Sequence, residues 1–409
     1  MTLALFEGFG IEMEYMIVAR DDLHIVSCCD ALLREVAGEQ VNEVEQGPLC
    51  WSNELALHVV ELKTNGPVPR IAGAWDAFAA GIAAVNRRLA SRGAMLLPTA
   101  MHPSMDPATA RLWPHDGKPI YNTYDRVFGT SGHGWVNLQS THLNLPFRGD
   151  DEFGRLHAAI RATLPLLPAL AASSPVCDGR RQAELDHRLQ VYLGNQRRIP
   201  SIIGQVVPEP VWTRADYERE ILQPMYRDIA PFDPDGELQD EWLNSRGAIA
   251  RFDRDAIEIR VLDLQEHPGA DLAVVDLVAW VVAMLCDERH VSQAELRALA
   301  TEPLARLFVT AVAQADATVV GHAPLLRALG IAATRVSAGE LWRELAARRH
   351  AAADADPRLA AALRPILDHG CLARRIATVL GPAPSAAAIT ELWRELASCL
   401  QRGAAFVPA

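Results

Sequence analysis

The segment GIEMEYMIV, from Gly10 to Val18, has the alternation of a β-strand that is buried on one side only. Its apolar residues would point to one face of a sheet, and its two glutamates, Glu12 and Glu14, to the other. Ionised carboxylates on one face repel each other and are costly to bury, so they need cations, protons or solvent. The pair therefore marks either the solvated side of an ordinary strand or one wall of a binding site.

Three other predicted strands carry polar groups in the same way. In NLQSTHLNLPF, His142 and Asn144 share a face; in AIEIRVLDL, Glu258 and Arg260 do; and Glu61 stands among aliphatic residues in HVVELKT. Each position also has a structural interpretation, since His142 could be a hydrogen-bonded core histidine and Glu258 with Arg260 a cross-strand ion pair. Polar faces on four separate strands favour one common site.

If these faces converge, the sheet presents several carboxylates and one imidazole to a single cavity. Carboxylate oxygens suit a hard cation such as Mg²⁺ or Mn²⁺, and the set lacks the thiolates of a structural zinc site. Arg260 would lie beside the metal ions and could hold a phosphate oxygen. The predicted metal ligands are Glu12, Glu14, Glu61, His142 and Glu258.

Glu54 is a further acidic candidate that needs a local change of direction. It lies seven residues before Glu61, so the two side chains would face opposite ways on one unbroken strand. A loop or bulge near Ser52 to Glu54 would aim both at one cavity, and the polar sequence CWSNE permits such a turn.

Composition limits the classes of partner. Half of the 409 residues are hydrophobic, and the net charge is -12 without a long basic block, which favours small substrates over nucleic acid or an anionic membrane. The first ten residues show no basic region of a signal peptide, and the apolar run from Leu272 to Cys286 is short and carries Asp276, so we expect a core helix there. Seven cysteines without CxxC spacing predict free thiols and a cytoplasmic protein.

The order of predicted elements favours an α+β fold, with an antiparallel or mixed sheet and helices on one face. No glycine fingerprint follows a strand, as a Rossmann or P-loop protein would require. After about residue 290 the chain is nearly all helix and contains ELWRELA twice, a repeat that we attribute to similar amphipathic helices. Strands are predicted at Phe9–Val18, Leu55–Thr64, Ala94–Ala100, Trp135–Pro146 and Ala256–Leu264, and helices at Ile71–Arg92, Glu152–Ala172, Ala183–Arg198 and Asp271–Cys286.

Several motifs, in this order, resemble those of the carboxylate-amine ligase family that includes the type 2 glutamate-cysteine ligases. They are GIEMEYMIV, HVVELKTNGPVP, MHPSMDP, NLQSTHLNLPF and RFDRDAIEIRVLDLQEHPGAD, and the final ELWRELASCLQRGAAF resembles the closing helix of the family. The resemblance implies a glutamine-synthetase-like fold, in which a curved antiparallel sheet holds two or three Mg²⁺ ions around the phosphates of ATP. It implies a catalytic domain at residues 1–290 and a helical C-terminal extension at residues 291–409 packed on it.

The resemblance also assigns roles to residues. It places metal ligands at Glu12, Glu14, Glu54, Glu61, His142 and Glu258, and a phosphate-binding arginine with a catalytic role at Arg260 beside Glu258. Asn144, on the same predicted face, is a second candidate for binding ATP phosphates. The implied reaction is ATP-dependent amide formation, in which a carboxylate, typically the γ-carboxylate of glutamate, becomes an acyl phosphate that an amine attacks.

Residues 180–209 depart from the family pattern, which leaves the acceptor open between cysteine and another amine, or even a peptide. Arg197 and Arg198 are candidates for binding a substrate carboxylate or phosphate, and the alternative is that one of them pairs with a surface acid. Two other functions remain open: a phosphotransferase acting on a guanidinium or carboxylate, and a non-catalytic nucleotide-binding regulator. The helical tail could serve regulation or assembly into a homo-oligomer.

Overall fold

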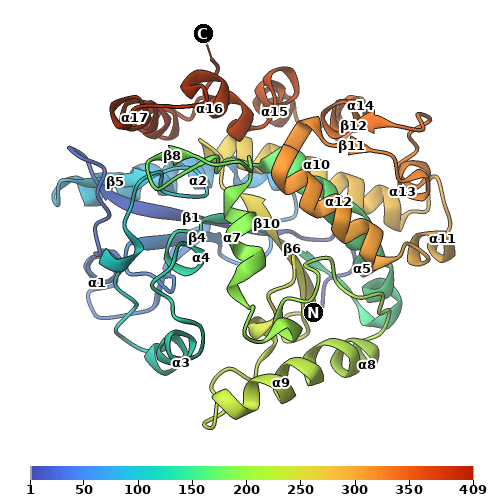
Figure 1. Cartoon of the computed structure of the whole chain (residues 1–409), viewed down its shortest axis with the longest axis horizontal. Helices are drawn as coiled ribbons and strands as arrows, with labels where there is room; N and C mark the ends of the chain where they lie inside the picture. Colours follow the sequence, from blue (N-terminus) through green and yellow to red (C-terminus); the bar gives the residue numbers. More distant parts are fainter. Residues whose placement is uncertain (1, 409) are drawn as a thin grey trace.

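The computed structural model describes residues 2–408 and centres on one eight-stranded antiparallel sheet (Figure 1). The sheet contains β1 (Gly10–Ala19), β2 (Glu43–Gln46), β3 (Leu49–Asn53), β4 (Val59–Thr64), β5 (Ala94–Leu97), β6 (Ser140–Pro146), β9 (Ala248–Arg251) and β10 (Ala256–Asp263). The strand order is β2-β3-β4-β1-β6-β10-β9, and β5 pairs with β1 beyond the end of β6. The α+β prediction with an antiparallel sheet is therefore confirmed.

Helices cover the apolar face of this sheet. The helices of this part are α1 (Cys29–Ala37), α2 (Trp75–Ala90), α3 (Lys118–Phe128), α4 (His133–Val136), α5 (Gly149–Thr163), α6 (Leu167–Ala171), α7 (His187–Asn195), α8 (Arg214–Tyr217), α9 (Gln223–Ile229) and α10 (Pro268–Cys286). α5 and α6 contact β10, α10 contacts β6, and α2 contacts β3 and β5. Ile11, Met13, Leu143 and Ile259 are fully buried beneath them, as the alternation requires.

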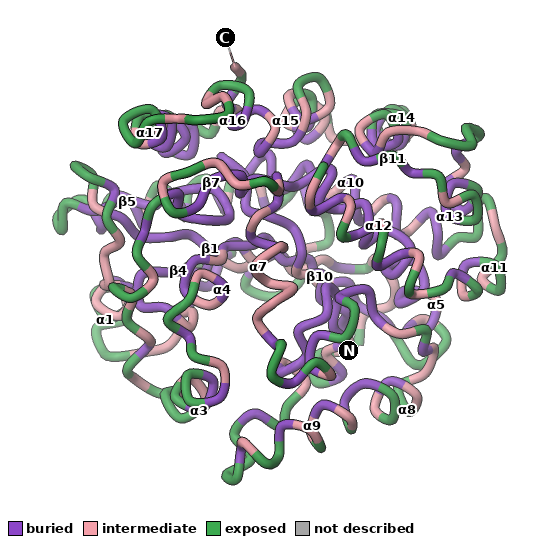
Figure 2. Tube along the Cα trace, in the orientation of Figure 1, coloured by how far each residue is buried: buried purple, intermediate pink, exposed green. Residues whose placement is uncertain are grey.

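Helix α10 is the most apolar helix of the fold. By length and composition alone it could cross a membrane, but 83% of its apolar window is buried inside the protein. Only three of its residues are partly exposed. Figure 2 shows the helix inside the molecule, beneath the outer helices. The prediction of a core helix is confirmed, because a helix that is apolar on all sides needs protein around it.

The C-terminal part of the chain is helical and packs on the same core. It contains α11 (Gln293–Arg297), α12 (Thr301–Gln314), α13 (Ala323–Ala328), α14 (Ala338–His350), α15 (Pro357–His369), α16 (Leu372–Leu380) and α17 (Ala386–Arg402), with a small hairpin of β11 (Val319–Val320) and β12 (Val336–Ser337). α15 packs on α10, and α17 packs on β5 (Figure 1). The two ELWRELA copies lie on α14 and α17, where Trp342 and Trp393 are both buried. Their indoles donate to different partners, Leu166 O and Thr99 Oγ1.

Three predicted strands are shorter than their sequence patterns. The strand predicted from Leu55 begins at Val59, because residues 55–57 bond to residues 111–113 instead. The strand predicted to Ala100 ends at Leu97, just before Pro98, which has no N–H to donate. The segment predicted from Trp135 starts within helix α4, and its strand begins at Ser140. The sequence patterns also missed β2, β3 and β9, which are short.

The predicted helices differ mainly at prolines and caps. The segment 152–172 is interrupted between α5 and α6 by a 3₁₀ turn at Leu164–Leu166, where Pro165 cannot continue the α-helical hydrogen bonds. The segment 183–198 is helical only in α7, which starts after Asp186 because that side chain accepts a hydrogen bond from Leu189 N. Residues 71–74 form a 3₁₀ turn before α2. A short hairpin of β7 (Val176–Cys177) and β8 (Arg180–Arg181) also lies outside the main sheet.

Candidate active site

The strand register brings the predicted polar residues onto one face of the sheet. On β1, Glu12 lies directly opposite His142 of β6, and Glu14 lies directly opposite Glu61 of β4. Glu258 of β10 is opposite Asn144 of β6. Because the side-chain period of a strand is two, these pairings carry all of these polar groups to the side away from the helices.

Glu12 and His142 form the centre of the group. His142 Nδ1 lies 3.0 Å from Glu12 Oε2, and Asn144 Nδ2 donates to Glu12 Oε1 at 3.1 Å. Burial would raise the pKa of Glu12, but the hydrogen bond and charge of His142 lower it to about 2. Burial would likewise lower the pKa of His142, and its carboxylate neighbours raise it to about 9. Without metal ions, the two residues are therefore a carboxylate and an imidazolium ion at neutral pH.

Glu14 is bound from the start of β6. Its Oε2 accepts hydrogen bonds from Ser140 N at 2.6 Å and from Ser140 Oγ at 2.9 Å. The same hydroxyl lies 2.9 Å from His142 Nε2. The second glutamate of the opening motif is therefore connected to the imidazole through one serine.

Glu258 and Arg260 are next to each other at the β10 side of the face. Arg260 Nε donates to Glu258 Oε1 at 2.9 Å, and the other carboxylate oxygen lies 3.6 Å from Arg251 Nη1 on β9. The register of β10 shifts after Ile259, and such a bulge re-aims the side chains that follow it. The alternative of a cross-strand ion pair between Glu258 and Arg260 is therefore wrong in one respect: this contact is within one strand, and the ion pair of Glu258 with another strand is formed by Arg251.

Glu61 lies between a hydroxyl and an ammonium group. Ser52 Oγ donates to its Oε2 at 2.8 Å, and Lys63 Nζ lies 3.4 Å from the same oxygen. Burial and the charges of Glu12 and Glu14 raise the pKa of Glu61 to about 7, although Lys63 acts in the opposite direction. Ionisation of Glu61 is therefore opposed first by its burial and then by its two carboxylate neighbours.

Glu54 lies just after β3 and not on a strand, as the spacing to Glu61 required. Burial and the charges of Glu14 and Glu61 raise the pKa of Glu54 well above its usual range. Its carboxyl is therefore close enough to these glutamates for their charges to raise its pKa. The loop predicted near residues 52–54 lies slightly later than expected, because Ser52 and Asn53 still belong to β3 and the chain leaves the strand only at Glu54.

The donor set fits divalent metal ions. Ligand atoms of Glu12, His142 and Glu258 lie within 4.8 Å of one another, as do those of Glu14, Glu61 and His142. All donors are carboxylate oxygens except one imidazole nitrogen, which is the chemistry of Mg²⁺ or Mn²⁺. Burial, and after it the charges of neighbouring carboxylates, raise the pKa values of Glu54 and Glu61, and bound cations would favour the ionised form of both groups.

A cleft opens from this face at the start of β1. It encloses about 630 Å³ and is lined by Gly10, Glu12, Lys63, Asn144 and Arg254, among others. A volume of this size accommodates a small-molecule ligand. Two predicted site residues, Glu12 and Asn144, therefore border open space, whereas Glu14 and Glu258 are buried behind it.

Arg197 and Arg198 follow α7 and are both exposed. Arg198 Nη1 donates to Val127 O at 2.7 Å, and its guanidinium lies over the ring of Phe232 at 4.4 Å. Neither arginine forms an ion pair with an acid among residues 2–408, so the surface pairing considered from the sequence is absent there. The hydrogen bond of Arg198 instead connects the segment after α7 to the end of α3. The side chain of Arg197 lies near Gly194.

Three contacting residues of the site were not predicted from the sequence. Lys63 lies two positions after Glu61 on β4 and therefore shares its face. The alternation of this strand could have identified it from the sequence. Ser52 and Arg251 lie on β3 and β9, whose short patterns gave no strand prediction. Their contacts with Glu61 and Glu258 appear only once the sheet order is known.

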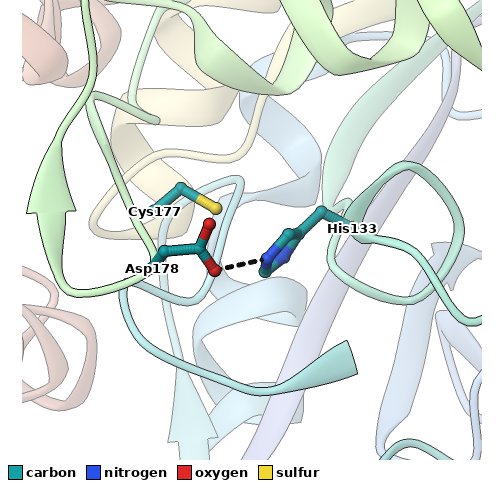
Figure 3. Close-up of side chains that lie close together, drawn as sticks. All are labelled: His133, Cys177 and Asp178. Carbon is teal, nitrogen blue, oxygen red and sulfur yellow. Dashed lines mark hydrogen bonds and ion pairs between the residues drawn. The ribbon is translucent and has the colours of Figure 1, made fainter. Parts of the chain in front are cut away.

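A second group of potential ligands, His133, Cys177 and Asp178, lies around the β7–β8 hairpin (Figure 3). His133 Nε2 is 2.8 Å from Asp178 Oδ1, and Asn137 Nδ2 is 2.9 Å from His133 Nδ1. The amide orientation is fixed because Asn137 Oδ1 accepts from His102 N, so Nδ2 donates to His133 Nδ1. The proton of the His133 ring is then on Nε2, which donates it to Asp178. Burial, together with the charge of Asp178, raises the pKa of Cys177 to about 12. We interpret this group as a structural hydrogen-bond network.

Fold and site together define a carboxylate-amine ligase. The family model of glutamate-cysteine ligase family 2 (GCS2) matches residues 8–395, and the chain belongs to this family. An uncharacterized protein of Archaeoglobus fulgidus is 36% identical over 276 residues, which cover 68% of this chain and 73% of that protein.

Two solved structures share the fold. One is the glutamate-cysteine ligase of Francisella tularensis in complex with AMP, with a TM-score of 0.61 and 14% identity over 98% of this chain and 90% of that chain. The other is a bifunctional glutathione synthetase from Pasteurella multocida, with a TM-score of 0.56 and 15% identity over 96% of this chain and 52% of that chain. At such identities the similarity shows the common architecture, and it confirms the glutamine-synthetase-like fold expected from the motifs.

Proposed function

We propose that the protein is an ATP- and Mg²⁺-dependent ligase that joins a carboxylate to an amine through an acyl phosphate. The donor we favour is the γ-carboxylate of glutamate, and the acceptor is cysteine or another amine. The observation that carries the proposal is the pair of ligand groups that share His142 on one sheet face. Membership of the family supports the same class of reaction.

The proposed metal ligands are the five residues of the sheet face and Glu54, and they would hold two or three ions. Bound Mg²⁺ would offset the charge of the phosphates and of the phosphoryl group as it transfers. Arg260 and Asn144 are the residues we propose to bind phosphate oxygens, because both lie on this face as hydrogen-bond donors. Glu258 holds the guanidinium of Arg260 in position through its hydrogen bond at 2.9 Å.

The reaction needs no protein nucleophile. An oxygen of the substrate carboxylate attacks the γ-phosphorus of ATP, and the bond from that phosphorus to the bridging oxygen of ADP breaks. The amine then attacks the acyl carbon, loses a proton and expels inorganic phosphate. The residues of this chain bind and orient the reacting groups and supply charge, which is the main source of rate enhancement in phosphoryl transfer.

We further propose that Arg197 binds a substrate carboxylate or phosphate, since its guanidinium is exposed and has no acidic partner among residues 2–408. Arg198 keeps its contact with Val127 O in this proposal and has a smaller part in binding. We retain residues 1–290 as the catalytic unit and residues 291–409 as the extension. The seven free cysteines fit the cytoplasm, where ATP and Mg²⁺ are available.

A substrate screen tests the function. Purified protein is incubated with ATP, Mg²⁺, glutamate and a panel of amines that includes cysteine and short peptides, and products are identified by mass. We expect an amide and one phosphate per amide, both dependent on the amine. A phosphorylated guanidinium or carboxylate product would instead identify a phosphotransferase, and nucleotide binding without any turnover would identify a regulator.

Glu12→Gln is the matched variant for this screen. The amide keeps the shape of the side chain but removes a metal-binding charge, so we expect the rate to fall on the order of a thousandfold. Amide formation at the wild-type rate by this variant would contradict the proposed role of the sheet face.

A further inference from the structure

Lysine is rare in this chain. Of its 39 Lys and Arg residues, only Lys63 and Lys118 are lysines. Among residues 2–408, the ion pairs that do not involve histidine use arginine, except the two formed by Lys63. The chain uses arginine for nearly all of its cations but has a lysine in the proposed catalytic cleft. A compact ammonium group with rotatable N–H donors cannot be replaced there by a planar guanidinium without a change in geometry.

Lys63 occupies a central position on the sheet face. It is the direct cross-strand partner of Glu12 on one side and of Cys50 on the other, and it lines the cleft of about 630 Å³. Its Nζ lies 3.4 Å from Glu61 Oε2 and 3.3 Å from Glu43 Oε2. The ammonium group is therefore next to two proposed metal ligands, Glu12 and Glu61.

The N–H groups of Lys63 are available to a ligand. Both carboxylate contacts are ion pairs without hydrogen-bond geometry, and among residues 2–408 the ammonium group donates no hydrogen bond. The side chain is only 28% exposed, and its open side is the cleft. Ser52 Oγ already donates to Glu61 Oε2 at 2.8 Å, so Glu61 keeps a donor when Lys63 turns away. Three N–H donors at the wall of a cleft fit an oxyanion.

We propose that Lys63 is a further catalytic residue of this site and donates hydrogen bonds to a phosphate oxygen of the nucleotide in the cleft. This inference rests on the proposed function, which brings ATP phosphates to the carboxylate face. When cations take up the charge of Glu61, its attraction for Lys63 weakens, and the phosphate becomes the strongest nearby acceptor. A single point charge follows the phosphoryl group during transfer more easily than a fixed fork does.

The competing role for Lys63 is that of a counter-ion for Glu43 and Glu61. In that role its loss would destabilise the metal-free protein and would leave nucleotide binding unchanged once metal is saturating. The two roles therefore differ in what the removal of Lys63 does to the nucleotide.

The test compares Lys63→Met and Lys63→Arg with the matched control Lys118→Met. Lys118 is the other lysine, is exposed at the start of α3 and forms no ion pair among residues 2–408, so we expect its loss to change each reading less than twofold. Calorimetric titrations of the full chain use Mn²⁺ alone, then a non-hydrolysable ATP analogue, ADP and glutamate at saturating Mg²⁺. Steady-state rates are measured in parallel.

We expect Lys63→Met to bind the ATP analogue at least tenfold more weakly and to bind Mn²⁺ alone no more weakly than the wild type. Lys63→Arg should retain part of the nucleotide affinity, because it keeps the charge, and should still turn over at least tenfold more slowly. Unchanged nucleotide affinity with reduced thermal stability would overturn the proposal in favour of the counter-ion. Weaker binding of glutamate alone would overturn it in favour of a substrate carboxylate. Amide formation at the wild-type rate by Lys63→Met would overturn it while the proposed function stands, and a wild type that binds no ATP analogue would overturn both.

Discussion

His142 Nδ1 lies 3.0 Å from Glu12 Oε2, and the two residues are direct cross-strand partners on β6 and β1. The other ring nitrogen lies 2.9 Å from Ser140 Oγ, which donates to Glu14. One imidazole therefore connects both glutamates of the opening motif. Without metal ions this imidazolium is the cation that offsets part of the negative charge on the sheet face.

We expect His142→Ala to destabilise the metal-free protein by about 3 kcal/mol, because it removes one partner of a buried charge pair and leaves the other. Urea unfolding in the presence of a chelator measures this loss. Ser140→Ala is the control, since Ser140 N still donates to Glu14, and its cost should be about 1 kcal/mol. Equal stability of His142→Ala and the wild type in chelator would show that the imidazole does not offset this charge.

Asp271 should give the stability of the protein a measurable pH dependence. Its Oδ1 accepts from Thr141 Oγ1 at 2.6 Å and from Gln265 N at 2.9 Å, and burial raises its pKa from 3.8 to about 7. The folded protein thus holds a proton that the unfolded chain has lost, so this stabilisation is complete below pH 3.8 and disappears as the pH rises towards 7. Between these limits the free energy of unfolding should fall by about 1.4 kcal/mol per pH unit from this group.

Asp271→Asn separates this effect from other titrating groups, because the amide keeps an acceptor oxygen for Thr141 and cannot titrate. We expect the slope of unfolding free energy against pH, measured by urea unfolding from pH 5 to 7 at saturating Mg²⁺, to be smaller in the variant by about one proton. Identical slopes in the two proteins would show that Asp271 is ionised throughout.

Strand alternation was sufficient to predict most of the sheet face. The period of two placed Glu12, Glu14, His142, Asn144 and Glu258 correctly on one side, because one-sided burial leaves that pattern in each strand. The sequence could not provide the strand order, which decides that Glu61 lies opposite Glu14 and that Arg251 approaches Glu258. Such neighbours come from segments far apart in the chain, and no local pattern encodes which strands pair.

The helix boundaries show the second limit of local patterns. The run from residue 152 to 172 is apolar enough for one helix, yet the backbone changes at Leu164–Leu166 because of Pro165. Glu54 shows the reverse case, since its odd spacing from Glu61 predicted a break in the strand, and the chain does leave β3 at Glu54 before β4 begins. Backbone-restricting residues and broken periodicity are thus local signals, whereas contacts of the exposed Arg197 and Arg198 depend on tertiary structure that the sequence pattern does not contain.

The C-terminal helices should be essential to the stability of the sheet and of the helices before residue 290. Arg375 Nη1 on α16 donates to Glu266 Oε1 at 2.6 Å, just before α10, and both side chains are fully buried. Arg375 also donates to Phe406 O. Because Arg375→Met leaves the carboxylate of Glu266 without its cation, we expect a loss of about 3 to 5 kcal/mol in chemical denaturation.

The double variant Arg375→Met with Glu266→Met is the matched comparison. It removes both charges, so we expect it to be more stable than Arg375→Met alone. A double variant that is no more stable than the single one would show that the loss comes from packing and from the bond to Phe406 O, and not from the unpaired charge.

Glu54 provides the sharpest test of how far the metal site extends. Burial and the charges of Glu14 and Glu61 hold the pKa of Glu54 well above its usual range, so ionising its carboxyl is unfavourable in the metal-free protein. Glu54→Gln should therefore change the metal-free stability by less than about 0.5 kcal/mol. If Glu54 binds a metal ion, the same variant should lower the affinity for Mn²⁺ about tenfold or more, because an amide cannot supply a charged ligand.

Titration calorimetry with Mn²⁺ measures this affinity, and Glu45→Gln is the control. Glu45 lines the same cleft but is exposed on β2, so its neutralisation should change the affinity less than twofold. The comparison isolates ligation from the general loss of one negative charge, since both variants lose a carboxylate near the same cleft. Equal Mn²⁺ affinities in the two variants would restrict the metal ligands to the residues on the strands, and Glu54 would then lie beside the metal ions without binding one.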